Sequence, residues 1–227
     1  MAISDFSSEV AENYEQKCLC VLVLDVSGSM SGQRINDLNR GLQDFYAEIS
    51  EDLTTSQRLE VALITFNDFV NTIQQPALVD NFSMPTLSAN GLTNLVPAVF
   101  EAIDMVAARK AWYKTTNQPY YRPWIILMTD GRPEGGNQDV DGLASRIKED
   151  TRNKRYAFLP IGVGEGVDMA TLNKIRGDIP PLKLSETKFS SFFKWLSASM
   201  GTVVASEAGQ SVDLSKGDTS WMTNFKI

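Results

Sequence analysis

An unbroken apolar run, Cys18 to Leu24, is followed at once by an aspartate, Asp25. The run Trp124 to Met128 has the same character and is likewise followed closely by an aspartate, Asp130. A strand that is buried on both faces is apolar throughout, whereas a strand with one solvated face alternates. Such strands occur mainly in parallel sheets covered by helices on both sides, so the chain predicts an α/β fold.

Strand-like and helix-like segments alternate from Cys18 onward, which is typical of a doubly wound sheet. An apolar stripe at steps of three and four predicts a long helix after the first strand. Its members are Ile35, Leu38, Leu42, Phe45, Ile49 and Leu53. The runs Leu59 to Phe66 and Phe69 to Ile73 are separated only by Asn67 and Asp68, which predicts a hairpin. We therefore expect a mostly parallel sheet with one antiparallel edge strand and helices on both faces.

The second half of the chain continues this pattern. A helix is expected to begin at Asn94, with Thr93 near its N-cap and Pro97 in the first turn, where a missing N–H does least harm. The later elements expected are a strand at Trp124 to Thr129, helices at Val140 to Lys154 and Asp168 to Arg176, strands at Tyr156 to Val163 and Leu182 to Leu184, and a terminal helix from Phe189.

One domain at 18–208 accounts for this pattern, with an N-terminal extension at 1–17 and a polar C-terminal tail at 209–227. The formal net charge of −7 works against binding to nucleic acid, because phosphates would be repelled. The apolar runs are only strand-sized and the first residues do not resemble a secretory signal, so we expect a cytoplasmic protein that does not span a membrane.

The chain has two cysteines, Cys18 and Cys20, and no histidine. Both cysteines fall in the first expected strand and point to the same face, where buried, inert thiols are the favoured interpretation. A zinc site would need more ligands than these two residues supply.

Small polar residues with metal-ligand character follow the first strand, in Asp25-Val26-Ser27-Gly28-Ser29. Ligands of open α/β sheets bind beyond the carboxyl ends of the strands, and Asp130 follows another strand at the same end. Thr93, at the start of a helix, is expected to meet them there. Three hydroxyls and two carboxylates suit a hard ion, so we predict that Asp25, Ser27, Ser29, Thr93 and Asp130 bind Mg²⁺; Mn²⁺ or Ca²⁺ could take its place. The alternative is a set of separate turns and helix caps.

Three motifs, DVSGSMSG, the threonine in NGLTN and the aspartate in LMTDGRP, resemble the metal-ion-dependent adhesion site of von Willebrand factor A domains. Within that superfamily, QPYYRPWIILMTDGRPEG, PIGVGEGVDMATL, PPLKL and FFKWLSASM resemble the bacterial TerY type, which is associated with tellurium resistance and stress response. The likeness spans about residues 18 to 204. Leu92 departs from it, because many relatives have a second glycine there.

The resemblance implies that Ser27, Ser29 and Thr93 bind the ion through their hydroxyls, while Asp25 and Asp130 hold metal-bound waters or orient the serines. It also implies a partner protein whose Glu or Asp carboxylate completes the site. For the TerY type that partner would be an associated kinase or phosphatase. We therefore expect an adaptor without enzymatic activity.

Other interpretations remain open. A metal-dependent hydrolase or phosphatase could use Asp25 as nucleophile. Phosphatases of the haloacid dehalogenase kind have a second acid two residues later as general acid, but that position is Ser27 here. A structural subunit could use the ion only to brace its loops. Arg132 and Glu134 could line the rim of the metal face or lie in a solvated loop. In some related domains the terminal helix shifts on binding, which would make Phe192, Phe193 and Leu196 a switching element.

Overall fold

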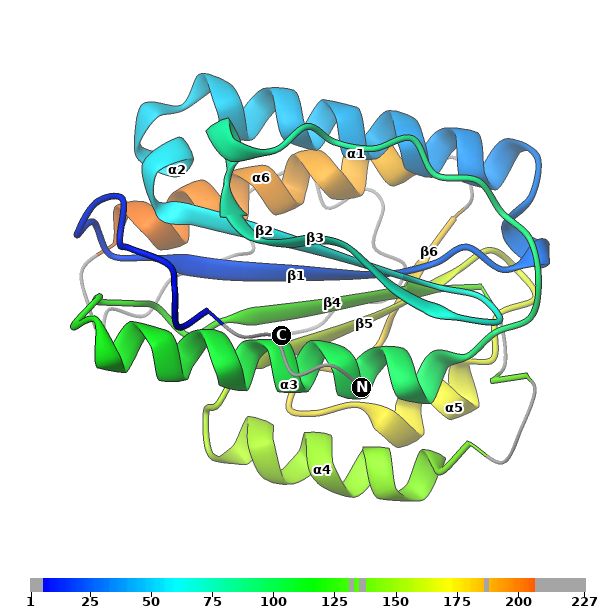
Figure 1. The fold of residues 1–227 in the computed structure, drawn as a ribbon. Helices are drawn as coiled ribbons and strands as arrows, with labels where there is room; N and C mark the ends of the chain where they lie inside the picture. Colours follow the sequence, from blue (N-terminus) through cyan, green and yellow to red (C-terminus); the bar gives the residue numbers. More distant parts are fainter. Residues whose placement is uncertain (1–5, 131–132, 135–137, 186–187, 207–227) are drawn as a thin grey trace.

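The fold is a six-stranded sheet with helices on both faces (Figure 1). The computed structural model describes residues 6–130, 133–134, 138–185 and 188–206. The strands are β1 (Cys18–Asp25), β2 (Leu59–Phe66), β3 (Val70–Leu78), β4 (Trp124–Thr129), β5 (Ala157–Val163) and β6 (Leu182–Leu184). The helices are α1 (Gln33–Glu51), α2 (Leu53–Arg58), α3 (Leu95–Thr115), α4 (Val140–Arg152), α5 (Met169–Ile175) and α6 (Phe189–Ala205), with short 3₁₀ turns η1 (Gly28–Met30) and η2 (Val79–Asn81).

The strand order is β3-β2-β1-β4-β5-β6, and every pair is parallel except β2 and β3. The prediction of a mostly parallel sheet with one antiparallel edge strand is confirmed. Strand β3 runs to Leu78, further than the expected Ile73, and passes through Pro76. Its register shifts near there, since Val61 pairs with Ala77 but Leu63 pairs with Gln74. An edge strand with a bulge tolerates a proline, because the missing N–H has no essential ladder partner.

Strand β1 lies at the centre of the molecule and sends alternate side chains to two separate cores. Cys18, Cys20, Leu22 and Leu24 join the core under α1 and α6. The residues between them, such as Val21, join the core under α3 and α4. Figure 1 shows these two helical layers on opposite faces of the sheet. Because all eight residues of β1 are buried, its continuous apolar run is explained by cover on both sides.

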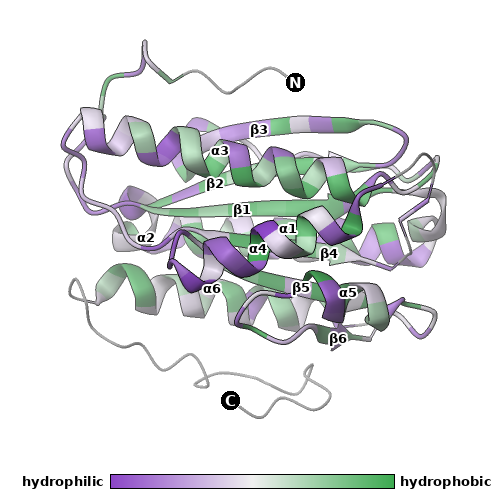
Figure 2. Cartoon of the chain, turned by 90° about the horizontal axis from the view of Figure 1, so that it is seen from below, coloured by the Kyte–Doolittle hydropathy of each residue, from purple (hydrophilic) through white to green (hydrophobic). Residues whose placement is uncertain are grey.

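The polarity of the strands follows their place in the sheet. Figure 2 shows β1 in the green of hydrophobic residues, whereas edge strand β3 is partly purple. Cys18 and Cys20 are free and fully buried, as expected for inert thiols. Burial raises the pKa of the Cys18 thiol to about 12, so the nucleophilic thiolate is strongly disfavoured.

The helix after β1 ends earlier than its apolar stripe indicated. Helix α1 stops at Glu51, and Asp52 caps a new helix by accepting a 2.6 Å hydrogen bond from the Thr55 backbone N–H. Leu53 opens α2 and its side chain is 78% exposed, so its inclusion in the buried stripe was wrong. The cap explains the break, since a side-chain acceptor at Asp52 satisfies the first free N–H groups of a separate helix.

The remaining elements agree with the sequence to within a few residues. Helix α3 has Asn94 as its N-cap and Pro97 in its first turn, and Asp168 caps α5. Residues 6–16 precede β1 and lie against the domain, where Phe6 packs on Trp112 and Tyr113. The tail at 209–227 lies outside the described residues. Within the described part of the chain, no helix has the length and apolar character that a bilayer crossing requires.

Candidate functional site

Two aspartates lie at the carboxyl ends of neighbouring parallel strands. Asp25 is the last residue of β1, and Asp130 directly follows β4. Leu24 pairs with Met128 across these strands, so the two loops that leave them start side by side. This edge is where open α/β sheets bind ligands, and both side chains were predicted to meet here.

Asp25 is fully buried at the base of the site. Its Oδ1 accepts the Ser27 backbone N–H at 2.8 Å, and its Oδ2 accepts the Thr129 hydroxyl at 2.6 Å. Burial, with a smaller contribution from nearby Asp130, raises the pKa of the Asp25 carboxyl to about 6, although the hydrogen bonds from Ser27 and Thr129 favour its ionised form. Asp25 accepts hydrogen bonds from Ser27 and Thr129, and within the part of the chain that the structure describes no cation contacts its carboxylate.

A chain of side-chain hydrogen bonds leads from the buried base to the surface. The Ser27 and Ser29 hydroxyl oxygens lie 3.0 Å apart, and the Ser29 hydroxyl donates to Asp130 Oδ1 at 2.6 Å. Ser27 is 1% exposed and Asp130 6%, whereas Ser29 is an exposed residue of η1. The polar side chains therefore lead from the buried Asp25 to the exposed Ser29.

The loop that carries Thr93 is tied to both strand ends by backbone hydrogen bonds. The Gly28 N–H donates to the Gly91 carbonyl at 2.9 Å, and the Glu134 N–H donates to the Thr93 carbonyl at 2.9 Å. Thr93 itself is 2% exposed. Gly91 has φ +77°, and a Cβ there would meet Asp68 Oδ2 at 2.0 Å, so only glycine allows this close contact. The structure thus brings the three predicted loops to one place.

The donor set can be tested against the ion that it was predicted to bind. In an octahedral Mg²⁺ site with bonds of about 2.0–2.1 Å, neighbouring ligand oxygens lie about 2.9 Å apart. The separation of 3.0 Å between the Ser27 and Ser29 oxygens matches this spacing. The buried Asp25 carboxylate beside neutral hydroxyls also supplies negative charge that a divalent cation would balance, whereas the second buried carboxylate, Asp130, is paired with Arg34. The residues present therefore fit Mg²⁺.

Two side chains at the site were missed by sequence reasoning. Thr129 holds Asp25, and Arg34 donates from Nη1 to Asp130 Oδ2 at 2.6 Å and to the Ser29 carbonyl at 3.1 Å. Arg34 is the second residue of α1, and a cation at a helix N-terminus is electrostatically unfavourable. This unfavourable position was the one sign in the sequence that Arg34 has an acidic partner elsewhere. Of the two rim candidates, Glu134 is bound to the Thr93 loop through its backbone, and Arg132 lies outside the described residues.

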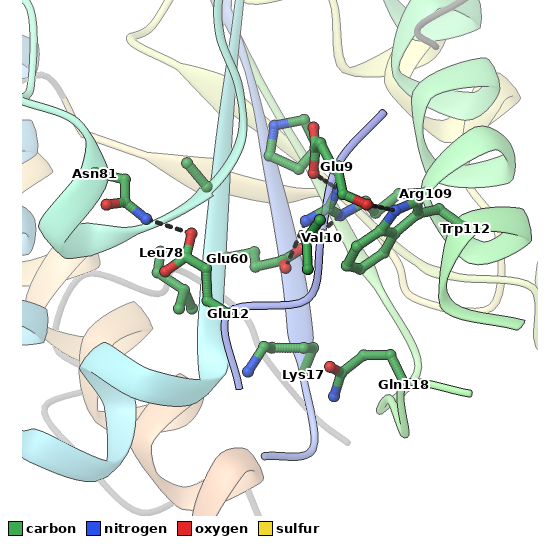
Figure 3. Close-up of a pocket in the computed structure, with 12 residues that line it drawn as sticks. Glu9, Val10, Glu12, Lys17, Glu60, Leu78, Asn81, Arg109, Trp112 and Gln118 are labelled. Carbon is green, nitrogen blue, oxygen red and sulfur yellow. Dashed lines mark hydrogen bonds and ion pairs between the residues drawn. The ribbon is translucent and has the colours of Figure 1, made fainter. Parts of the chain in front are cut away.

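A second polar cluster lies at the opposite end of the sheet. Arg109 of α3 donates to both oxygens of Glu60 at 2.9 and 2.8 Å and also pairs with Glu9 (Figure 3). Its guanidinium lies 4.1 Å from the Trp112 ring centroid. A cavity of about 260 Å³ adjoins these residues and Lys17. Arg109 pairs with Glu60 and Glu9, and Lys17 donates to Asn13 and to the Gln57 carbonyl oxygen, so the cluster attaches the segment before β1 to the domain.

Comparisons with known proteins agree with the fold. The family model of the von Willebrand factor type A domain matches residues 20–194. Human inter-alpha-trypsin inhibitor heavy chain H4 is 29% identical over 171 residues, which are 70% of this chain but 17% of the human protein. The chain thus spans less than a fifth of that relative.

Among solved structures, a von Willebrand factor type A protein from Catenulispora acidiphila superposes with a TM-score of 0.60 at 18% identity, covering 82% of this chain and 43% of that one. The pilus adhesin SpaC from Lactobacillus rhamnosus GG gives a TM-score of 0.67 at 14% identity, covering 83% of this chain and 30% of the adhesin. At these identities the likeness concerns the fold alone. Since the family model covers most of the chain, the protein belongs to the von Willebrand factor type A domain family.

Proposed function

We propose that this domain binds Mg²⁺ through Asp25, Ser27, Ser29, Thr93 and Asp130 and uses the site to bind an acidic side chain of a partner protein. Von Willebrand factor A domains are general interaction and adhesion modules, which supports a protein partner. The observation that carries the proposal is the 3.0 Å spacing of the Ser27 and Ser29 oxygens beside Asp130, at the exposed end of a buried polar chain.

The proposed ligand residues have different roles, which depend on how deeply each is buried. Asp25, held by Ser27 and Thr129, supplies negative charge from below and fixes the loop that carries the serines. Asp130 accepts a hydrogen bond from the Ser29 hydroxyl. With its proton directed at Asp130, the Ser29 oxygen has a lone pair available for the metal ion. Neutral hydroxyls donate little charge, so a bound Mg²⁺ would stay electron-poor and could exchange a water for an outside carboxylate.

The partner surface would include more than the carboxylate. Phe69, in the turn between β2 and β3, and Leu92, in the Thr93 loop, are 70% and 47% exposed. The two segments are joined, since the Leu92 N–H donates to Asp68 Oδ1 at 3.2 Å. An acidic residue next to an apolar one on the partner would match this rim. The net charge of −7 would repel an acidic partner at long range, so the attraction must be local to the ion.

The cellular role follows from the resemblance to the TerY type. We infer an adaptor in a bacterial stress-response or tellurium-resistance system, with an associated kinase or phosphatase as partner. This proposed role would place the domain in the cytoplasm.

The burial of Asp25 weighs against the alternative of a hydrolase. A nucleophilic carboxylate must reach its substrate, but Asp25 has no exposed surface and each of its oxygens already accepts a hydrogen bond. The other alternative, an ion that only braces the loops, differs in its consequence: removal of the ion would disorder the loops without any partner being involved.

Calorimetric titration with Mg²⁺, followed by pull-down from native cell extract with and without EDTA, tests the proposal. Asp25→Ala and Thr93→Ala should lose Mg²⁺ binding and the captured partner. The matched controls Asp80→Ala and Thr202→Ala change exposed residues outside the site and should behave as the parent does. Added Mg²⁺ should restore the complex only where the site is intact.

Circular dichroism completes the test, because the two apolar cores do not depend on the ion and the domain should stay folded in EDTA. Mg²⁺ binding that survives both site substitutions would refute the ligand assignment. A complex that persists in EDTA with a folded domain would show that the partner binds elsewhere.

A further inference from the structure

The guanidinium of Arg34 reaches from the first turn of α1 into the candidate metal site. We propose that Arg34 is a built-in counter-ion of Asp130 that stabilises the metal-free domain and competes with the metal for this carboxylate. This inference rests on the metal site proposed above. It assigns to a residue outside the ligand set the role of setting how tightly the ion is held.

The contacts of Arg34 converge on the same atoms that the metal would need. Its Nη1 lies 2.6 Å from Asp130 Oδ2 and 3.1 Å from the Ser29 carbonyl oxygen. The other carboxylate oxygen, Oδ1, accepts the Ser29 hydroxyl at 2.6 Å. Arg34 therefore contacts two of the proposed ligand residues, Asp130 and Ser29, and occupies one oxygen of the Asp130 carboxylate.

The burial of this pair is uneven, which indicates how each partner behaves. The Asp130 side chain is 2% exposed, whereas the Arg34 side chain is 27% exposed. A buried carboxylate without a cation is costly, so the metal-free domain needs Arg34 at this place. The partly exposed guanidinium can be displaced toward solvent, where hydration compensates for the lost contact.

The position of Arg34 on its helix supports a role in pairing. The N-terminus of a helix carries partial positive charge, which disfavours a cation in the first turn. Gln33 and Arg34 open α1, and its first turn contains no acidic residue to offset this charge. The ion pair with Asp130 supplies the compensating interaction from a different loop.

Competition follows from charge alone. A divalent cation beside Asp130 and a guanidinium on the same carboxylate repel each other at a distance of a few ångströms, and burial reduces the screening by water. Each therefore weakens the other, and the coupling is reciprocal. Removal of the Arg34 charge should destabilise the empty site and favour the occupied one, two effects of opposite sign.

The experiment compares the full chain with Arg34→Gln, Arg34→Lys and the control Arg40→Gln. Arg40 lies on the same helix, is 67% exposed, and faces Asp37 at 3.6 Å, so it matches the charge change without contact to the site. The dissociation constant for Mg²⁺ is measured by calorimetry, and the melting temperature is measured in EDTA and in saturating Mg²⁺.

For Arg34→Gln we expect Mg²⁺ to bind about tenfold more tightly, which corresponds to about 1.4 kcal/mol. Its melting temperature in EDTA should fall by roughly 2–4 °C. In saturating Mg²⁺ this deficit should shrink, because tighter binding stabilises the folded state more. Arg34→Lys keeps the charge and should bind Mg²⁺ nearly as the parent does, and Arg40→Gln should match the parent in every measurement.

The outcomes separate the two proposals. If the parent binds Mg²⁺ and Arg34→Gln binds it no more tightly, the role of Arg34 is overturned while the metal site stands. If the parent binds no Mg²⁺, the metal site fails, and competition fails with it. The melting temperature in EDTA then still shows whether Arg34 stabilises Asp130.

Discussion

The Thr129 hydroxyl donates a 2.6 Å hydrogen bond to Asp25 Oδ2, across 104 residues of sequence and between two adjacent parallel strands. Thr129 is the last residue of β4 and Asp25 the last of β1, so the bond links the ends of these two strands at the base of the candidate metal site. Together with the bond from the Ser27 backbone N–H, it holds a carboxylate that has no exposed surface.

Replacement of Thr129 by valine should therefore weaken the site. Valine has a similar volume but no hydroxyl, which leaves one oxygen of a buried carboxylate without its donor. We expect a loss of about 1–3 kcal/mol in the free energy of unfolding and weaker Mg²⁺ binding. Denaturant unfolding and calorimetry measure the two effects. Thr202→Val removes an exposed helical hydroxyl and is the control; an equal change in both variants would contradict the role of Thr129.

The exposed apolar rim should contribute to partner binding. Phe69→Ala and Leu92→Ala remove side chains that are 70% and 47% exposed, so stability should change by less than about 0.5 kcal/mol. Loss of a central contact in an interface typically costs more than about 1 kcal/mol of binding free energy. Pull-down yield and surface plasmon resonance measure the affinity of each variant for the partner. Leu53→Ala, 78% exposed at the start of α2, should bind the partner as the parent does. Unchanged affinity in both rim variants would place the partner elsewhere.

The ion pair at the far end of the sheet should matter for stability and not for the metal. Glu60→Ala leaves the Arg109 guanidinium, 5% exposed, without its main partner, and Tyr113 loses the acceptor of its hydroxyl. We expect a loss of about 3–5 kcal/mol in the free energy of unfolding. Glu15→Ala breaks a pair whose carboxylate is 44% exposed and should cost less than about 1 kcal/mol. If folded Glu60→Ala protein binds Mg²⁺ more weakly, the two ends of the domain are coupled.

Helix α6 should respond when the metal site is occupied. It packs along α1, which begins directly after the metal loop, and a Cβ at Gly41 of α1 would meet Phe193 Cδ2 at 2.6 Å. Because the two helices pack so closely, we expect a displacement of α1 on metal binding to move α6 as well. Hydrogen exchange across residues 188–204 should change on binding of partner and Mg²⁺, while α4 serves as the internal reference. Identical exchange in the free and bound states would show that α6 does not switch.

The breaks and irregularities of the elements depended on local contacts that periodicity does not report. The apolar stripe of α1 continued in phase to Leu53, yet the Asp52 cap divides the helix and leaves Leu53 exposed. The strand expected to end at Ile73 continues through Pro76 to Leu78, because its edge position and a bulge tolerate the proline. The hydrogen bond at the Asp52 cap decided the first case, and the missing N–H of Pro76, tolerated at the edge, decided the second. An apolar pattern reports neither of them.

The apolar pattern and the order of the segments were enough to predict β1, its burial on both faces and the antiparallel hairpin. They also indicated the end of the sheet where Asp25, Thr93 and Asp130 are expected, because the direction of each strand follows from the alternation of strands and helices. The contact of Ser29 with Asp130 across 101 residues and the pairing of Arg34 with the same carboxylate could be seen in the folded chain alone. Those contacts depend on strand order and loop path. Both arise from packing of the whole chain, since no local pattern encodes which distant side chain will neutralise a buried charge.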